Sequence, residues 1–328
     1  MTVAFRVSII DLSMDKLCLQ LKFFWNLDLA KSQADAILTQ LSSRWEQEFE
    51  TLCDLVDCSA VVHADETNWS INSVWAFLSE QARVLVLGCR KDADTLTEIL
   101  REDSFAGVLV SDDAAVYQGL SHAQKCWTHL LREAIRLTLL YPQNDEYQSL
   151  QDGLMEVFRE SKRTAADGRF GPNGRAAKVN DLENQLAEVC LIRCSEDIDG
   201  PRDETDREFY NPVHEVVRVM LDEELFAFVV RGDVSATNNE AERSLRGAAL
   251  DRRTGRTSKT VRGARQRTVL VSVFETLKLH LPKFTLTNVV EEVVDWYRTR
   301  ESRFSKLCMG YGLDPPSSPR LQILIPAN

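Results

Sequence analysis

The amino-acid sequence predicts an α/β fold built on one mixed β-sheet. Residues 15–57 carry apolar side chains at intervals of three and four, without glycine or proline, which predicts helix. The period then changes. AVVHA (60–64), SVWAFLS (73–79) and RVLVLGC (83–89) are short runs rich in β-branched and aromatic residues, separated by short turns, and they predict an antiparallel meander. From residue 92 onward helices alternate with strands, which predicts parallel pairing.

The alternating elements follow in a clear order. Asp92 is placed to cap the first helix, and Tyr141-Pro142 ends the last one, because the residue before a proline is disfavoured in a helix. The predicted elements are a helix at 92–102, a strand GVLVSDD at 107–113, a short helix at 114–120, a strand AQKCW at 123–127 and a helix at 129–140. Three antiparallel strands followed by parallel strands, with the first strand central, form the ribonuclease H-like fold.

The rest of the chain is predicted to be mainly helical. Polar loops rich in glycine and charge interrupt it at 167–175 and 195–206, and a Pro-rich stretch at 310–328 is expected to be loosely attached. We expect an N-terminal helical segment (1–57), a first part of the ribonuclease H-like core (58–142), a helical insertion (143–231), a second part of the core with a catalytic helix (232–300) and a C-terminal tail (301–328).

Composition narrows the class of protein. Hydrophobic residues make up 44% and charged residues 27% of 328 residues, which are ordinary values for a globular chain. No apolar run approaches the roughly 18 residues of a membrane span, and the start lacks the features of a secretory signal. The eight cysteines show neither C-x-x-C nor zinc-site spacing. We therefore expect a cytoplasmic protein with reduced thiols and no membrane partner.

Charge is distributed unevenly along the chain. The net charge of −11 argues against a general nucleic-acid binder. However, residues 243–267 hold nine basic side chains against one acidic side chain, Asp251. Because a phosphate backbone feels only the face that approaches it, this segment can bind a polyanion, although such a run is also typical of a solvated helix face.

Three acids are candidates for metal ligands. Asp65 lies at the end of the first strand and Asp112 at the end of the fourth, and in this fold those strands are neighbours. Glu242 lies one turn into a helix that Asn238 or Asn239 can cap. Three carboxylates at one place repel each other unless cations neutralise them, and two Mg²⁺ ions would do so.

Each acid also has a purely structural interpretation. Asp65 could cap the turn into the hairpin, and Glu242 could complete a capping box with Asn239. Asp112 or Asp113 could cap the helix at 114, and Asp113 is the better candidate for that role. The sequence leaves open whether Asp112 or Asp113 is the second ligand.

Four motifs taken together resemble the DDE transposases of the insertion sequence 66 family. The motifs are HADETNW, FAGVLVSDDAAVYQGL, KCWTHLLREA and TNNEAERSLRGAALDRRTGRTSKTVRGARQRTVLVSVFETLK, and the resemblance covers about residues 20–300. Asp113 stands where that family usually has glycine, and Gly247 where it often has proline. No zinc-site spacing precedes Asp65, so we expect the N-terminal zinc module of that family to be lacking.

The resemblance implies a function and a set of site residues. The metal-binding catalytic acids would be Asp65, Asp112 and Glu242, with two Mg²⁺ or Mn²⁺ ions. The supporting residues would be Trp127, His129, Asn238 and Asn239. The DNA-binding residues would be Arg243, Arg246, Arg252, Arg253, Arg256, Lys259 and Arg262.

The implied activity is a Mg²⁺-dependent DNA transposase that hydrolyses phosphodiester bonds at mobile-element ends and joins them to target DNA. Its partners would be both DNAs, further copies of itself on DNA and accessory proteins of the element, at the bacterial nucleoid. The alternatives are an inactive or regulatory DNA-binding relative, and a metal-dependent nuclease without strand transfer.

Overall fold

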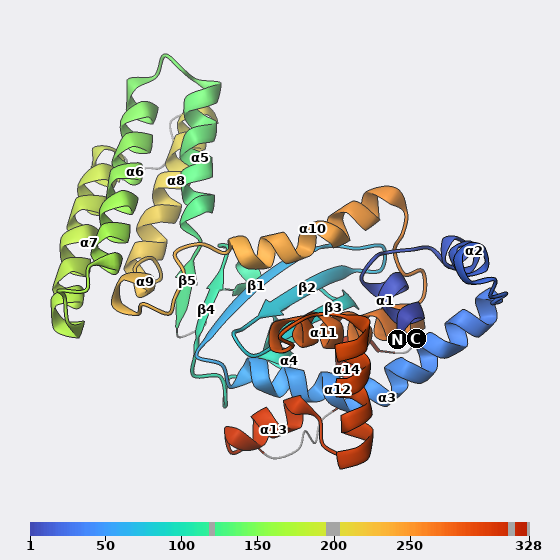
Figure 1. Cartoon of the computed structure of the whole chain (residues 1–328). Helices are drawn as coiled ribbons and strands as arrows, with labels where there is room; N and C mark the ends of the chain where they lie inside the picture. Colours follow the sequence, from blue (N-terminus) through green and yellow to red (C-terminus); the bar gives the residue numbers. More distant parts are fainter. Residues whose placement is uncertain (118–121, 195–203, 314–318, 327–328) are drawn as a thin grey trace. The chain divides into compact units, whose positions relative to one another are not determined.

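The chain has the predicted α/β fold, with a mixed five-stranded sheet and flanking helices (Figure 1). The structure is a computed structural model and describes residues 1–117, 122–194, 204–313 and 319–326. The chain forms two compact units, of which the first combines 1–107 with 239–328 and the second is 108–238.

The first unit contains the antiparallel meander and most of the N- and C-terminal helices. Its elements are α1 (Thr2–Ser8), α2 (Met14–Trp25), α3 (Lys31–Asp57), β1 (Val61–Asn68), β2 (Ser73–Leu78), β3 (Arg83–Cys89), α4 (Ala93–Ile99), α10 (Asn239–Thr254), α11 (Val261–His280), α12 (Leu286–Thr299), α13 (Arg303–Gly310) and α14 (Arg320–Leu324). The three predicted strands are present, and Asp92 caps α4 by accepting the Thr95 N–H at 3.0 Å.

The N-terminal helical region is broken where the sequence predicted continuity. α2 ends at Trp25, Asn26 takes the left-handed conformation with φ 50°, and α3 begins at Lys31. The prediction of helix through residues 26–30 was therefore wrong. Asparagine ends helices in this conformation without the strain that most residues would meet, so it replaces the glycine whose absence suggested an unbroken helix.

The face of the meander that carries the site is fixed by strand register. β1 pairs with β2 and β2 with β3, both antiparallel, and Asp65 lies directly opposite Ala76. Ala76 packs in one apolar cluster with Ala241 and Leu245 of α10. Because directly opposed residues project from the same face of a sheet, Asp65 is on the face that α10 covers.

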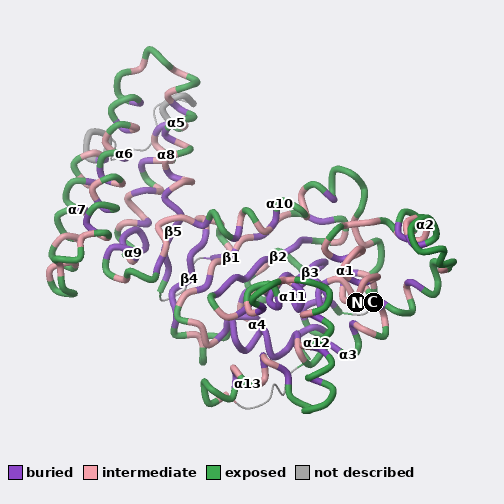
Figure 2. The backbone as a smooth tube through the Cα atoms, in the orientation of Figure 1, coloured by how far each residue is buried: buried purple, intermediate pink, exposed green. Residues whose placement is uncertain are grey.

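The edge of the meander at β3 is closed by side-chain hydroxyls of α11. Thr276, Ser272 and Thr268 accept the backbone N–H groups of Arg83, Leu85 and Leu87 at 3.0, 2.9 and 2.9 Å. Hydroxyls four residues apart on a helix are about 6 Å apart along its axis, close to the spacing of alternate strand residues, so the two ladders match. This stretch of α11 is buried (Figure 2). An exposed strand edge that could pair with another chain is thereby avoided.

The C-terminal segment is docked, contrary to the expectation of a loosely attached tail. Arg320 is 1% exposed, and its Nη2 lies 2.6 Å from Asp54 Oδ1 on α3. Glu50 accepts the N–H groups of Arg320 and Leu321, both at 3.0 Å. The Pro-rich composition of this region concealed an arginine whose charge can be buried only beside acids such as these.

The second unit contains the parallel strands and a group of long helices. Its elements are β4 (Val108–Ser111), the 3₁₀ turn η1 (Ala115–Tyr117), β5 (Ala123–Lys125), α5 (Trp127–Leu140), α6 (Asp145–Ala166), α7 (Pro172–Cys194), α8 (Glu204–Leu221) and α9 (Ala227–Val230). β4 and β5 pair in parallel, with Ser111 opposite Lys125. The helices α5 to α8 pack against one another and bury apolar residues such as Leu150, Leu154 and Leu186.

Several boundaries in this unit differ from the prediction. α5 begins at Trp127 rather than at residue 129, because Cys126 occupies the cap position. α7 begins at Pro172, inside the predicted loop, because proline suits the first helical position. The predicted helix at 114–120 is a turn at 115–117, with 118–120 outside the described residues. Likewise, 195–203 of the predicted loop at 195–206 lie outside them, and α8 begins at Glu204.

Candidate active site

Asp65 and Glu66 are adjacent acids on β1 that point to opposite faces of the sheet. Glu66 is buried on the far face and forms an ion pair with Lys91 at 2.5 Å. Asp65 is partly exposed on the face that α10 covers, and its Oδ1 accepts the Glu66 N–H at 2.9 Å. Of these two acids, only Asp65 is on the side of the sheet where α10 lies.

Glu242 is on the first turn of α10, in the same unit as Asp65. Ala241 and Leu245 hold this helix against β1 and β2, and Glu242 is partly buried beside them. α10 begins at Asn239, so Asn238 is at the cap position and Glu242 is the fourth helical residue. A capping box between Asn239 and Glu242 needs Asn239 at the cap position, one residue outside the helix, whereas α10 begins with Asn239. Asp65 and Glu242 are thus on the same side of the sheet.

Asp112 and Asp113 follow β4 in the second unit and have different surroundings. Asp112 Oδ1 accepts the Ala114 N–H at 3.1 Å. Asp113 pairs with Arg218 of α8. One of the two acids was expected to cap the turn at 114, and Asp112 accepts that hydrogen bond, so the preference for Asp113 in this role was wrong. Asp113 thus forms an ion pair with Arg218, whereas Asp112 forms no ion pair within 4 Å among the described residues, although the charge of the buried Lys125 acts on it.

Three residues of the CWTH motif lie where β5 ends and α5 begins. The Cys126 N–H donates to Ser111 O at 2.8 Å, which ties this junction to the end of β4 beside Asp112. Trp127 is fully buried, donates from Nε1 to Leu225 O at 2.8 Å and stacks on Phe158. Trp127 is therefore part of the core of the second unit, and it anchors the start of α5.

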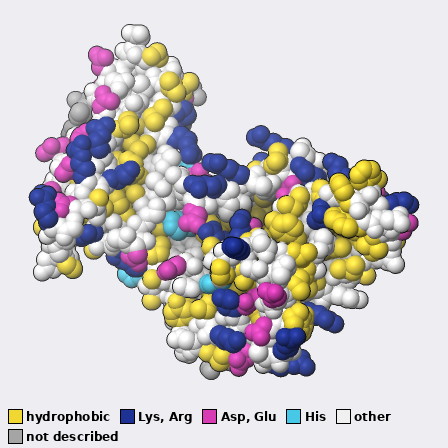
Figure 3. All heavy atoms as spheres, viewed as in Figure 1, with side chains coloured by type: hydrophobic (Ala, Val, Ile, Leu, Met, Phe, Trp, Pro, Cys, Tyr) yellow, Lys and Arg dark blue, Asp and Glu magenta, His cyan; other side chains and the backbone are white. Residues whose placement is uncertain are grey.

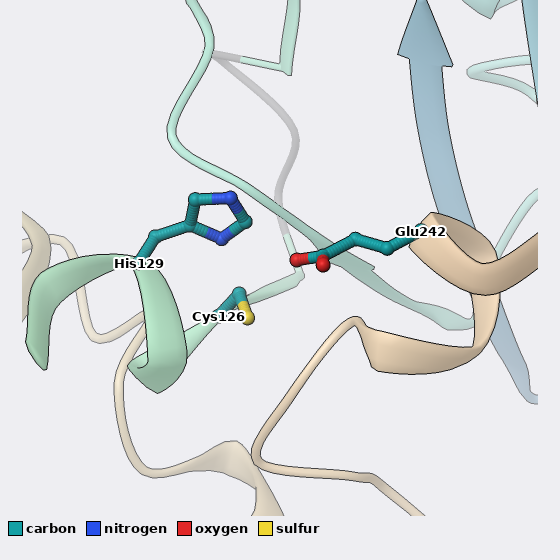
Figure 4. A group of neighbouring side chains, drawn as sticks. All are labelled: Cys126, His129 and Glu242. Carbon is teal, nitrogen blue, oxygen red and sulfur yellow. The ribbon is translucent and has the colours of Figure 1, made fainter. Parts of the chain in front are cut away.

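Cys126 and His129 are one turn apart at this junction (Figure 4). Cys126 is 1% exposed, and its Sγ accepts the Asn238 N–H at 3.2 Å. Burial alone would raise the thiol pKa, but hydrogen bonds from the His129 ring and the Asn238 N–H outweigh it, so the pKa of Cys126 is lowered. Sequence reasoning missed Cys126, although a cysteine three residues before a histidine at a strand end was a visible signal.

Two further residues that sequence reasoning missed are basic and lie near Asp112 and Asp113. Lys125 is 1% exposed, lies 3.8 Å from Glu224 and donates to Tyr117 O at 3.4 Å. Burial lowers the pKa of Lys125, and Glu224 opposes this effect. The other is Arg218. Lys125 is the first residue of the motif KCWTHLLREA, but its partner Glu224 is distant in sequence, as is Asp113, the partner of Arg218.

The predicted DNA-binding residues on α10 and the following loop are exposed, and dark blue Lys and Arg side chains lie along α10 in Figure 3. Some are already engaged. Arg262 pairs with Asp35, Arg256 lies 3.7 Å from Asp251, and Arg252 donates to Asn68 O at 3.3 Å. No ion pair occupies the others within the described residues, namely Arg243, Arg246, Arg253 and Lys259.

The helical spacing of α10 divides its arginines between two sides. Arg246 and Arg253 follow Glu242 at intervals of four and eleven residues and therefore share its side of the helix. Arg243 is rotated by about 100° from Glu242, since each residue of a helix turns by that angle. It faces a cavity described below.

The chemistry of the acidic residues fits a hard divalent cation. Asp65, Asp112 and Glu242 offer carboxylate oxygens, which Mg²⁺ and Mn²⁺ prefer. Two of these acids are on one side of the meander, and the third ends a parallel strand. At Asp112 one oxygen accepts a backbone N–H, and the carboxylate forms no ion pair within 4 Å among the described residues.

Every helix in the described part of the chain is too short or too polar to cross a membrane. A comparison with curated proteins finds no match. A comparison with protein families finds one whose sequence model, described as Transposase IS66 family, matches residues 20–266. That match spans most of the chain, including β1, β4 and α10 with their three acids. This chain is therefore a member of the IS66 family of transposases, and DNA is its partner.

Proposed function

We propose that the protein is a DNA transposase in which Asp65, Asp112 and Glu242 hold two divalent cations, Mg²⁺ or Mn²⁺. When bound, such ions activate a water or a 3′-hydroxyl and stabilise the leaving oxygen of the displaced phosphodiester. The single observation that carries the proposal is the register of β1: Asp65 is on the sheet face that α10 covers, and α10 presents Glu242 there.

The choice of Asp112 over Asp113 rests on their partners. Arg218 balances the charge of Asp113, so that carboxylate has a structural role. Asp112 accepts a backbone N–H through one oxygen, which orients the carboxylate. It forms no ion pair within 4 Å among the described residues, although Lys125 acts on it electrostatically, so its position is fixed without a guanidinium group bound to it.

The exposed arginines would bind the DNA backbone. Arg246 and Arg253 are on the Glu242 side of α10 and are about 10 Å apart along the helix axis. A guanidinium group can bind a phosphate through two parallel hydrogen bonds. We infer that these two residues hold the strand to be cut beside Glu242, and that Lys259 adds a contact from the following loop.

The remaining parts of the proposal concern organisation. We propose that residues 143–231 are a helical insertion between two parts of the catalytic domain, 58–142 and 232–300. We further propose that several copies assemble on element ends and target DNA at the nucleoid, with accessory proteins of the element.

The test replaces each acid without changing its shape. Asp65→Asn, Asp112→Asn and Glu242→Gln are each expected to abolish Mg²⁺-dependent and Mn²⁺-dependent DNA cleavage, while the thermal melt and DNA retention stay close to wild type. Glu291→Gln on α12 is the control, because it removes one exposed acidic charge elsewhere in the first unit. Full cleavage by any of the three variants would remove that residue from the proposed site.

A second measurement separates transposition from simple cleavage. Pre-cut DNA with a free 3′-hydroxyl is incubated with a supercoiled target plasmid and a divalent ion. Joined products are expected from wild type and absent from the three variants. Cleavage without joining would favour a nuclease, and DNA binding without either reaction would favour a regulatory relative.

A further inference from the structure

The first unit contains a cavity of about 590 Å³ beside α10. α10 packs on β1 and β2, and α11 runs along β3, so part of the sheet face between these helices stays uncovered. Leu78 and Leu85 of the sheet, Val271 of α11 and Ala248 of α10 line the apolar part of the cavity. Its volume is in the range of pockets that hold small organic ligands.

The charges around the cavity leave one basic group unbalanced. Each of the three acids lies beside a base: Glu240 beside Arg83 at 2.5 Å, Asp11 beside Arg267 at 2.5 Å, and Glu275 beside Lys278 at 3.7 Å. Arg243 is the fourth basic residue of the lining, and it has no ion-pair partner within the described residues. A ligand of this cavity should therefore carry a negative charge near Arg243 and an uncharged body.

The wall opposite the sheet is open at Gly247. A Cβ added there would meet no atom within 4 Å, and Gly247 lines the cavity. Glycine inside a helix costs about 1 kcal/mol relative to alanine. That cost has no compensation in packing, and the missing side chain keeps the cavity wide beside Arg243.

We propose that this cavity receives one unstacked nucleotide of the DNA substrate, with its base in the apolar part and its phosphate on Arg243. The inference rests on the proposed function, because it takes DNA to be cut beside Glu242, the residue before Arg243 in the chain. A base outside the stack needs an apolar environment for its faces, and its phosphate needs a cation nearby. The cavity supplies the apolar surface from the sheet, α10 and α11, and the cation from Arg243 of α10.

The experiment uses fluorescence of an unstacked base. The probe is a nicked duplex with one 2-aminopurine, placed in turn on either side of the nick, bound to the full-length Asp65→Asn protein so that no cleavage occurs. 2-Aminopurine is quenched in a stacked duplex and brightens when it leaves the stack. We expect an increase on binding at one of these positions.

Two variants at one position test the role of the cavity. Gly247→Leu should narrow the cavity beside Arg243, where an added Cβ meets no atom within 4 Å, and should abolish the increase in fluorescence. Gly247→Ala is the control, because it gains most of the helix propensity but adds only one methyl, and should retain the increase. Arg243→Gln should weaken binding of this probe about tenfold, the order expected for loss of a phosphate contact and of the base it holds.

The outcomes are separable from those of the catalytic test. An unchanged increase in Gly247→Leu, or no increase at any position with wild-type affinity for the probe, would overturn the inference. In the latter case the cavity would fit an apolar segment of a protein better than a base. Cleavage by Asp65→Asn would instead contradict the proposed metal site and leave the fluorescence result standing.

Discussion

Arg218 pairs with Asp113, the residue that directly follows Asp112 in the chain. The two adjacent acids therefore have different electrostatic environments, since Asp113 forms an ion pair with a guanidinium group and Asp112 accepts a backbone N–H. An arginine from α8 thus distinguishes two side chains that are chemically identical in the sequence SDDAA.

The pair predicts opposite results for two matched variants. Asp112→Asn should abolish DNA cleavage and leave the melting temperature unchanged. Asp113→Asn should retain cleavage but lower the melting temperature, because it leaves Arg218 without its main partner. Cleavage assays and thermal melts on both variants check this. If Asp113→Asn lost cleavage while keeping wild-type stability, Asp113 would be the metal ligand and Asp112 the structural residue.

The hydroxyl groups of α11 that bind the backbone of β3 predict a variant that loses stability without losing DNA cleavage. Ser272 Oγ accepts the Leu85 N–H at 2.9 Å and lies 3.2 Å from Leu85 O, to which it donates. Ser272→Ala leaves both buried backbone groups without that partner and should lower the free energy of unfolding by about 1–3 kcal/mol. Urea denaturation measures it. Thr254→Ala is the control, since that exposed hydroxyl donates to carbonyls of its own helix and accepts from the exposed Arg256 side chain, and an equal loss there would contradict the prediction.

The docked C-terminal segment predicts a larger effect. Arg320→Met leaves Asp54 without its closest buried cation, and breaking a buried pair typically costs about 3–5 kcal/mol. Because Glu50 binds backbone N–H groups of this segment, part of the docking should persist. Limited proteolysis should cut the variant near residue 320 sooner than wild type, whereas Arg298→Met on the surface of α12 should leave the cleavage rate unchanged.

Local sequence patterns predicted the positions of the strands. The features that these patterns missed depend on single residues or on partners that are distant in sequence. The meander and β4 carried β-branched and aromatic residues between turns, so their positions followed from the sequence. The break at Asn26 did not, because a single asparagine in a left-handed conformation leaves the apolar period intact on both sides. The docking of Arg320 was hidden because its acidic partners, Glu50 and Asp54, lie more than 260 residues away.

In the candidate site, too, some residues could be predicted from local motifs and others could not. The motifs placed Asp65 and Glu242, and strand register explains why they share a side of the sheet. The residues alone left Asp112 and Asp113 as alternatives, and only the resemblance favoured Asp112, because the physical difference comes from Arg218 on a helix about a hundred residues later. The cavity beside Arg243 could not be predicted either, since it exists only where two helices leave a sheet face uncovered.

Asp11 predicts a pH dependence of stability. Burial raises the pKa of Asp11 from 3.8 to about 6, and Arg267 opposes part of this effect. The folded state therefore binds this proton more tightly than the unfolded state does. The stabilising contribution is complete below 3.8 and is lost as the pH rises to about 6. The difference in unfolding free energy between wild type and Asp11→Asn should fall across that window. A constant difference would show that Asp11 titrates alike in both states.

The Glu242 side of α10 predicts a specific salt dependence for DNA binding. Arg246 and Arg253 are exposed there and have no ion pair within the described residues. Neutralising either residue to glutamine should weaken binding on any sequence and reduce the slope of log K against log salt by about 1, since each phosphate contact releases counterions. Arg169→Gln is the control, because this exposed arginine already pairs with Asp167 in the second unit. Fluorescence anisotropy over a range of salt concentrations measures the slopes. Equal slopes for all three variants would mean that DNA does not run along this side of α10.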